Sequence, residues 1–279
     1  MDKDEQPTFS RELMQSRNTN LIGSEQWDSQ WAISRAPRRL RAWRDYLSWR
    51  LARVFRQHIK PGDSVLEVGC GGSRFLPYFA RDLGAEVWGL DFAPAGVSSA
   101  RAALARARAN GNIVEGDLFT TTSIPLNYFD VVFSGGFIEH FTDTTDVVKR
   151  IVRFAKPQSG LIITMVPNMG GYIGKLHRRA DPELYAQHVA ISPGVMDASH
   201  REAGSQPVDP AEYFGTVLFS VVNINRPLSR VPRPLATVLK RLLEIPQFAV
   251  TAPVWALRTK LETASMSPVV LGVYRRTSN

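Results

Sequence analysis

A glycine-rich turn between two apolar segments constrains the fold of this chain more than any other feature. Residues 64–68 (Ser-Val-Leu-Glu-Val) predict a short buried strand, and glycines follow at positions 69, 71 and 72. A helix is expected to start near Ser73, a favourable N-cap, and to turn its apolar residues inward: Phe75, Leu76, Tyr78 and Phe79. Glycine accepts positive φ and leaves the backbone bare, and a helix start offers unpaired N–H groups. The segment therefore predicts a ligand site at the turn, or else a turn with a structural role alone.

The charges around the turn argue against a dinucleotide. The pyrophosphate-binding pattern G-x-G-x-x-G needs a third glycine, and Arg74 stands at that position after Gly69 and Gly71. Glu67, just before the turn, would repel a diphosphate, but it suits a ligand that carries a cationic amino group. The sequence thus favours a ligand with an ammonium group at this turn.

Two further acidic residues follow the next predicted strands. Residues 85–91 form a strand that ends at Asp91, where a carboxylate can accept both hydroxyls of a ribose. After the strand at 112–115, Asp117 can accept a hydrogen bond from an exocyclic amine such as that of adenine. An amino-acid end, a ribose and an adenine with no phosphate between them describe S-adenosylmethionine.

Together these motifs resemble those of the class I S-adenosylmethionine-dependent methyltransferases. The resemblance runs from about Ser64 to Asn168 and includes E-x-G-x-G-G at 67–72, Gly-Asp-Leu at 116–118 and Phe-Asp-Val-Val-Phe-Ser at 129–134. It implies that residues 67–72 line the methionine part of the cofactor, with Ser134 beside it. It also implies Asp91 at the ribose, and Phe92, Leu118 and Asp117 at the faces and amine of the adenine. The implied cofactor residues are Glu67, Gly69, Cys70, Gly71, Asp91, Phe92, Asp117, Leu118 and Ser134.

Strands and helices alternate along the middle of the chain, which predicts an α/β fold with a parallel, doubly wound sheet. The resemblance implies a Rossmann-like, mostly parallel sheet with an antiparallel last strand, N-terminal helices and a lid insertion. Further strands are expected at 128–134, 161–166, 217–224 and 268–275, and helices at 94–109, 142–154, 234–245 and 252–262.

The chain is expected to divide into an N-terminal helical extension, residues 1–60, and a class I methyltransferase domain, residues 61–279. The extension has a predicted helix from Pro37 to about Ile59, and Trp27 and Trp31 suggest a shorter helix with one aromatic face. The strand–helix pattern lapses at about 167–213, which predicts a lid and substrate-binding insertion of short helices.

His140 is the candidate catalytic residue. It follows the predicted strand 128–134, near where the sulfonium of the cofactor would point, and its ordinary pKa suits removal of a proton at neutral pH. A histidine that only bonds to backbone or cofactor is the alternative. Asn168, Tyr172 and His177 are candidate substrate contacts, and a structural role is open for each.

No metal is expected. Some members of the resembled family hold magnesium on E-x-x-E-H, but here Gly136 stands at the position of the first glutamate before Glu139 and His140. A lone carboxylate and imidazole make a poor magnesium site. The strand 128–134 also lacks the Asn/Asp-Pro-Pro-aromatic motif of adenine methyltransferases, and the one cysteine, Cys70, leaves no nucleophile for cytosine-C5 chemistry.

The formal charge of +8 allows an anionic partner, and arginines crowd the predicted helix 37–59. A solvated helix face is the simpler interpretation, and an anion-binding surface is the alternative. One cysteine excludes an internal disulfide, no apolar run is long enough to span a bilayer, and the charged start does not resemble a secretory signal. We therefore expect a cytoplasmic protein, and the sequence does not fix its oligomeric state.

The function predicted from the sequence is methyl transfer from S-adenosylmethionine to an oxygen of a small molecule or sugar, with nitrogen a close second. The alternatives are a methyltransferase of structured RNA that uses the arginine-rich helix, a non-methyl use of S-adenosylmethionine, and a non-enzymatic partner subunit that binds the cofactor.

Overall fold

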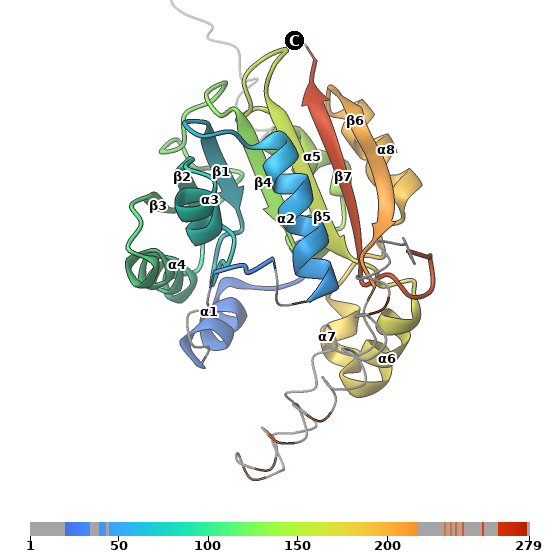
Figure 1. Cartoon of the computed structure of the whole chain (residues 1–279). Helices are drawn as coiled ribbons and strands as arrows, with labels where there is room; N and C mark the ends of the chain where they lie inside the picture. Colours follow the sequence, from blue (N-terminus) through green and yellow to red (C-terminus); the bar gives the residue numbers. More distant parts are fainter. Residues whose placement is uncertain are drawn as a thin grey trace, which may run out of the picture.

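The structure is a computed structural model that describes residues 20–33, 39–42, 45–216 and 262–277, with residues 232, 235, 238, 242 and 253 between them. A seven-stranded sheet lies between two layers of helices, in the order β3-β2-β1-β4-β5-β7-β6 (Figure 1). The strands are β1 (Ser64–Val68), β2 (Glu86–Asp91), β3 (Asn112–Glu115), β4 (Val131–Gly135), β5 (Leu161–Pro167), β6 (Ser205–Phe214) and β7 (Val269–Arg276).

Strands β1 to β5 are parallel, whereas β7 runs antiparallel to β5 and to the edge strand β6. The order reverses at β1, whose neighbours are β2 and β4. In such sheets the ligand crevice lies outside the carboxyl ends of the strands at the reversal. The predicted mostly parallel, Rossmann-like sheet with an antiparallel last strand is confirmed.

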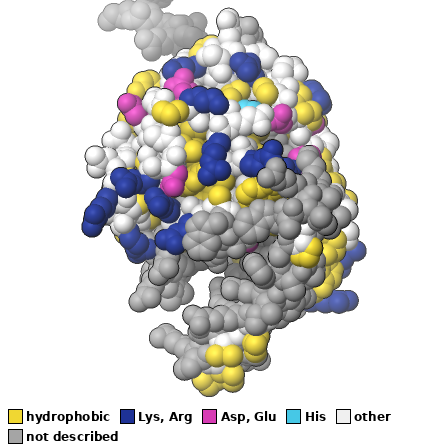
Figure 2. All heavy atoms as spheres, in the orientation of Figure 1, with side chains coloured by type: hydrophobic (Ala, Val, Ile, Leu, Met, Phe, Trp, Pro, Cys, Tyr) yellow, Lys and Arg dark blue, Asp and Glu magenta, His cyan; other side chains and the backbone are white. Residues whose placement is uncertain are grey.

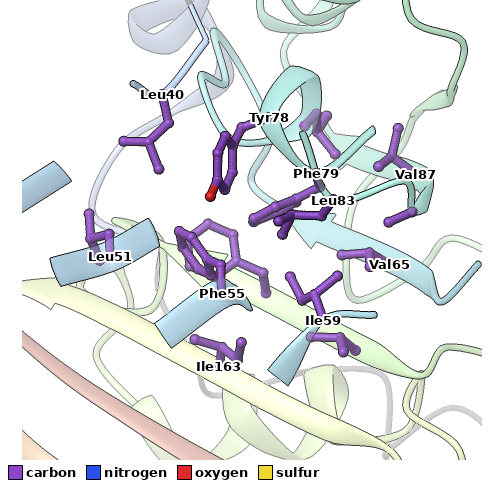
Figure 3. Close-up of a cluster of buried hydrophobic side chains, with 14 of the residues drawn as sticks. Leu40, Leu51, Phe55, Ile59, Val65, Tyr78, Phe79, Leu83, Val87 and Ile163 are labelled. Atoms are coloured by element: carbon purple, nitrogen blue, oxygen red, sulfur yellow. The ribbon is translucent and has the colours of Figure 1, made fainter. Parts of the chain in front are cut away.

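One face of the sheet is covered by α2 (Tyr46–His58), α3 (Leu76–Asp82) and α4 (Pro94–Ala107) (Figure 1). Phe55 of α2 is fully buried in this cluster, where its ring lies beside Phe79 of α3 (Figure 3) and also contacts Phe133 of β4. A buried phenylalanine contributes about 1.5–3 kcal/mol. Helix α2 of the N-terminal extension is therefore part of the hydrophobic core of the sheet.

The other face is covered by α5 (Thr144–Val152) and α8 (Pro193–Glu202). His200 of α8 is completely buried there, stacked 3.5 Å from the Tyr274 ring of β7, and its Nε2 lies 3.0 Å from Thr164 Oγ1. The Tyr274 hydroxyl donates to Asp197 Oδ1 at 2.7 Å. This satisfied polar network fixes α8 to the antiparallel end of the sheet.

Three helices lie below the carboxyl ends of the parallel strands in Figure 1: α1 (Ser24–Ile33), α6 (Tyr172–Ala180) and α7 (Pro182–Ala186). Helices α6 and α7 are the short helices predicted for the insertion. No helix among the residues that the structure describes is long and apolar enough to cross a membrane.

Two predicted helix starts are wrong. Residues 39–42 are not helical, and α2 begins at Tyr46 because the side chain of Asp45 caps it by accepting the Ser48 N–H. Helix α3 begins at Leu76 rather than near Ser73. The Ser73 hydroxyl still accepts the N–H groups of Phe75 and Leu76, so it serves the helix start from a position outside it.

The prediction of short helices up to residue 213 is also wrong, because residues 205–214 form the edge strand β6. This strand carries Pro207 and Pro210 and two register shifts against β7. Proline is tolerated on edge strands, where the missing N–H has no ladder partner. The predicted strand at 217–224 and the helices at 234–245 and 252–262 lie outside the described residues, apart from isolated positions.

Candidate active site

A pocket of about 330 Å³ opens at the carboxyl ends of β1, β2 and β4, under helix α1. Its walls are the glycine turn, the ends of the three strands, the turn after β4 and the N-terminal segment. The lining residues are Asn20, Trp27, Trp31, Glu67, Gly69, Gly71, Gly72, Ser73, Arg74, Phe75, Asp91, Phe92, Gly135, Gly136, Phe137, His140 and Phe141.

The glycine turn needs its glycines for two reasons. Gly69 and Gly72 have φ of 73° and 63°, a region that other residues rarely adopt. A Cβ on Gly69 would also lie 2.5 Å from the Phe137 ring, and one on Gly71 would lie 2.8 Å from Asp91 Oδ2. The backbone of the turn is thus packed too closely for side chains, and the predicted ligand site there stays a prediction.

Glu67 is buried at the end of β1 and lines the pocket. Its Oε2 accepts the Ser73 hydroxyl at 2.5 Å. Burial raises the pKa of this carboxyl to about 8, more than the bond from Ser73 lowers it. A cationic group in the pocket would favour the ionised form of Glu67, which is what the predicted ammonium ligand requires.

Asp91 ends β2 and also lines the pocket. Its Oδ2 accepts the Gly71 N–H at 2.6 Å, and its Oδ1 accepts the Ala93 N–H at 2.9 Å. Burial raises the pKa of this carboxyl above its usual range. These bonds fix the carboxylate at the mouth of the turn, and each oxygen keeps a lone pair for a further donor. Phe92, next in the chain, lines the same wall.

Other predicted cofactor residues do not line this pocket. Asp117 is exposed, and its Oδ1 accepts the Phe119 N–H; Leu118 is buried in the core beside it. Cys70 is buried behind the turn, and burial raises the pKa of its thiol, which suits a small packing residue. Ser134 is completely buried, and its Oγ has no hydrogen-bond partner among the residues that the structure describes. The roles of these residues stay predictions.

Helix α1 forms a wall that the sequence did not predict. The Trp27 and Trp31 rings stack with their centroids 6.0 Å apart, and Trp31 approaches Gly71 so closely that a Cβ there would lie 2.8 Å from its Nε1. Asn20 pairs with Phe141, and the Leu21 N–H donates to the His140 carbonyl at 2.8 Å. The spacing of Trp27 and Trp31 predicts a helix with one aromatic face, but no pattern in the sequence indicates that this face contacts the pocket.

His140 lies on η3 (Ile138–His140), the short turn that follows β4, and it lines the pocket. Its Nδ1 lies 3.0 Å from the Gln187 carbonyl, and its ring meets Trp27 edge-on with centroids 5.2 Å apart. Because Nδ1 faces a carbonyl oxygen it carries the proton, and the lone pair is on Nε2. Burial lowers the pKa of His140 to about 4, so the ring is neutral at neutral pH, although it is less basic than expected from the sequence.

The predicted substrate residues lie further out. Asn168 Nδ2 donates to the carbonyls of Ala264 and Ser267 at 2.8 and 2.9 Å, so its amide protons hold the segment before β7. Tyr172 and His177 lie on α6, with His177 buried and Tyr172 partly exposed. None of the three lines the pocket, and substrate contact by them stays a prediction.

Basic side chains are spread over the face of the molecule that carries α2, with acidic and apolar side chains among them (Figure 2). Arg50 of α2 is held by Glu262, with Nε 2.7 Å from Oε1, and Arg39 pairs with Asp82 at 3.2 Å. The Arg53 guanidinium lies over the Trp49 ring. These arginines have partners within the chain, which supports the interpretation of a solvated helix face.

The central part of the chain is similar in sequence to known methyltransferases. Residues 66–163 match a family described as "Methyltransferase domain". Phosphoethanolamine N-methyltransferase 1 of Zea mays is 32% identical over 115 residues, which are 40% of this chain and 22% of the maize protein. The match therefore spans about a fifth of the length of that relative.

Solved structures share the fold over a longer stretch. The [4+2]-cyclase SpnF superimposes with a TM-score of 0.57 and 15% identity, covering 92% of this chain and 98% of the cyclase. The phosphoethanolamine N-methyltransferase 2 of Haemonchus contortus, in complex with phosphomonomethylethanolamine and S-adenosylhomocysteine, gives a TM-score of 0.53 and 17% identity, covering 91% of this chain and 57% of the nematode protein. At these identities the likeness concerns the fold, and the predicted class I fold is confirmed.

Proposed function

We propose that this chain is an S-adenosylmethionine-dependent methyltransferase that acts on a small molecule, a proposal supported by the match of residues 66–163 to the methyltransferase-domain family. The observation that carries the proposal is the buried Glu67 carboxyl beside the bare glycine turn. The carboxyl fits the ammonium group of a methionine and the bare backbone of the turn fits its carboxylate. The same carboxyl, when ionised, would repel a diphosphate.

The remaining cofactor contacts follow from the order of the strand ends. Asp91, fixed by the Gly71 and Ala93 N–H groups, accepts the ribose hydroxyls, and Phe92 lies beside the adenine. The bound cofactor supplies an activated methyl group on a sulfonium. The chain then has to hold the acceptor in line with that group and keep water away.

His140 is the candidate base for an oxygen acceptor. Because Nδ1 keeps its proton and donates it in a hydrogen bond to the Gln187 carbonyl, the Nε2 lone pair can accept the proton of a hydroxyl. A nitrogen acceptor needs less help, and the low basicity of the buried ring makes nitrogen as suitable as oxygen. The curated relatives are N-methyltransferases of phosphoethanolamine, so phosphoethanolamine belongs among the first acceptors to be tried. A sugar acceptor and a cytoplasmic location stay predictions from the sequence.

Transfer of a labelled methyl group tests the proposal. The purified chain is incubated with methyl-labelled S-adenosylmethionine and a fractionated small-molecule extract, with phosphoethanolamine and total RNA as separate acceptors. We expect label in a small-molecule fraction, with equimolar S-adenosylhomocysteine. Glu67→Gln is the variant with weakened cofactor binding, and Glu86→Gln, which changes an exposed glutamate at the start of β2, is the matched control.

Label in RNA alone would replace this function with the RNA alternative. Product without S-adenosylhomocysteine would indicate a non-methyl use of the cofactor. Binding of S-adenosylmethionine without turnover on any fraction would indicate a partner subunit.

A further inference from the structure

A cluster of metal-ligating side chains lies beside the pocket, on its lid side. Glu139 and His140 come from η3, and His188 comes from the segment after α7. One ligand atom from each of the three residues lies within 4.8 Å of the others. His140 Nε2 is 3.7 Å from Glu139 Oε1, and the His140 and His188 rings have centroids 4.6 Å apart. A single ion can reach all three side chains.

Backbone groups hold the two imidazoles in the orientation that a metal requires. His140 Nδ1 lies 3.0 Å from the Gln187 carbonyl, and His188 Nδ1 lies 2.7 Å from the Leu184 carbonyl. Ligating histidines commonly donate their other ring N–H to a carbonyl in this way, which fixes the tautomer. The Val189 N–H donates to the Glu139 carbonyl at 2.7 Å, so the two segments are joined next to the cluster.

Two buried polar atoms in this region lack a partner among the described residues. Glu139 is only 1% exposed, and its Oε2 accepts no hydrogen bond. His177 of α6 is also buried, its Nε2 has no partner, and its ring centroid is 5.9 Å from that of His188. Buried polar groups are nearly always satisfied, so a carboxylate oxygen and an imidazole nitrogen left without partners indicate a missing ligand.

We propose that Glu139, His140 and His188 bind one divalent transition-metal ion. Two imidazoles and a single carboxylate suit ions such as Zn²⁺, Fe²⁺ or Co²⁺. Mg²⁺ prefers an all-oxygen shell, which this cluster cannot supply. This proposal reverses the expectation of no metal, which rested on Glu139 and His140 alone; His188 is distant in the sequence and supplies the third ligand.

The ion would lie between the pocket and the lid helices, because His140 lines the pocket and His188 follows α7. A bound ion and a free general base would use the same Nε2 lone pair of His140. The metal content of the active protein therefore decides between these two roles. The site itself does not depend on methyl transfer, and it can be tested without S-adenosylmethionine.

Binding of Co²⁺ tests the proposal directly. The full chain, free of any histidine tag and stripped with a chelator, is titrated with Co²⁺ by calorimetry and by visible absorption, in the absence of S-adenosylmethionine. We expect one ion per chain and d–d bands that indicate nitrogen ligands. His188→Gln and Glu139→Gln should each weaken binding about 10- to 100-fold or more, the range seen when even supporting residues of metal sites are removed.

His58→Gln is the matched control, because His58 Nε2 lies 2.7 Å from Asp209 Oδ2 and so forms a histidine–carboxylate pair outside the cluster. This variant should bind Co²⁺ like the parent. Circular dichroism establishes that each variant folds, and if His188→Gln does not fold, Glu139→Gln carries the test. No Co²⁺ bands in the parent, or equal affinity in the cluster variants and the control, would overturn the proposal.

Discussion

The two sides of the pocket are built in different ways. The cofactor side comes from one short stretch, residues 67–92, in which the glycine turn and the ends of β1 and β2 follow one another. The side that we assign to the acceptor brings together Trp27 of α1 and His140 of η3, and His188 beyond α7 packs against His140 outside the pocket lining. The first side is local in the sequence, whereas the second exists only after the chain has folded around the sheet.

Burial shifts the pKa values of Glu67 and His140 in opposite directions. It raises the pKa of Glu67 to about 8 on the cofactor side and lowers the pKa of His140 to about 4 on the acceptor side. Both shifts favour the neutral form, because burial disfavours charge. Glu67 and His140 are thus mostly uncharged near neutral pH until a ligand arrives: an ammonium group for the carboxyl, and a hydroxyl or a metal ion for the imidazole.

The largest effect is expected on the acceptor side. His140→Gln should lower turnover about 100-fold or more, the usual contribution of a positioned base, and should leave the affinity for S-adenosylmethionine within about twofold. Steady-state kinetics with the acceptor found in the labelling experiment, together with calorimetry for the cofactor, measure the two quantities. His58→Gln should leave both quantities unchanged. If His140→Gln turns over at the rate of the parent, His140 has no part in the chemistry.

The matching change on the cofactor side is Glu67→Gln. It keeps the shape of the side chain but removes the anion that pairs with the ammonium group. A hydrogen bond to a charged group contributes about 1.5–3 kcal/mol, so affinity for S-adenosylmethionine should fall about 10- to 100-fold. Calorimetry measures the loss, with Glu86→Gln as the control that keeps full affinity. Equal affinity for S-adenosylmethionine in the Glu67 variant and the control would mean that the Glu67 carboxyl does not pair with the ammonium group of the ligand.

Substitutions at two glycines with similar positive φ can distinguish an effect on stability from an effect on cofactor binding. Gly69 (φ 73°) lies in the turn against Phe137, whereas Gly62 (φ 87°) precedes β1 with open space around it. The left-handed conformation should lower the free energy of unfolding of Gly69→Ala and of Gly62→Ala by about 1–3 kcal/mol each, and Gly69→Ala should lose more because its Cβ would also meet the Phe137 ring. Urea unfolding measures this cost.

Only Gly69→Ala should also weaken cofactor binding, because its Cβ pushes the Phe137 ring that lines the pocket. A Gly62→Ala variant that loses as much affinity as Gly69→Ala would mean that the loss follows from lower stability and not from the geometry of the turn.

The smallest effect is a pH dependence of cofactor binding. In the free protein the pKa of Glu67 is about 8, so below pH 8 the carboxyl is protonated, and pairing with an ammonium group requires loss of that proton. Affinity should therefore rise with pH up to about 8, by at most about tenfold per pH unit, and fall again above it as the α-amino group of the ligand, with an ordinary pKa of about 8, loses its own proton. Glu67→Gln should remove the rise. A slope of the opposite sign below that pH in the parent would contradict the pairing.

The local elements were predictable from the sequence. The strands β1 to β5 and β7, helix α4 and the pocket residues Glu67 and Asp91 follow from apolar patterns, glycines and strand ends. Helix starts were less predictable, since the cap at Asp45 depends on one side chain, which accepts the N–H and the hydroxyl of Ser48 and outweighs apolar periodicity. The edge strand β6 was missed because its prolines interrupt the pattern of a strand, and its pairing with β7 depends on residues far along the chain.

The acceptor side could not be predicted for the same reason. Trp27 was recognised only as part of an aromatic helix face, and His188 belongs to no local motif. Their contacts with His140 depend on where the folded chain places α1 and the segment after α7. In the opposite direction, Asp117 had a motif, yet the structure leaves it exposed and outside the lining of the pocket. The motif around Asp117 thus does not mark the wall of this pocket, and the adenine contact predicted for it stays a prediction.

The central claim is that the turn after β1 receives an ammonium-bearing nucleoside and not a dinucleotide. Calorimetric titration of the purified chain with S-adenosylmethionine, S-adenosylhomocysteine, NAD and FAD tests it most directly. The account predicts one site for each of the two sulfur nucleosides and no heat of binding from either dinucleotide. Binding of a dinucleotide by a chain that ignores both sulfur nucleosides would contradict it.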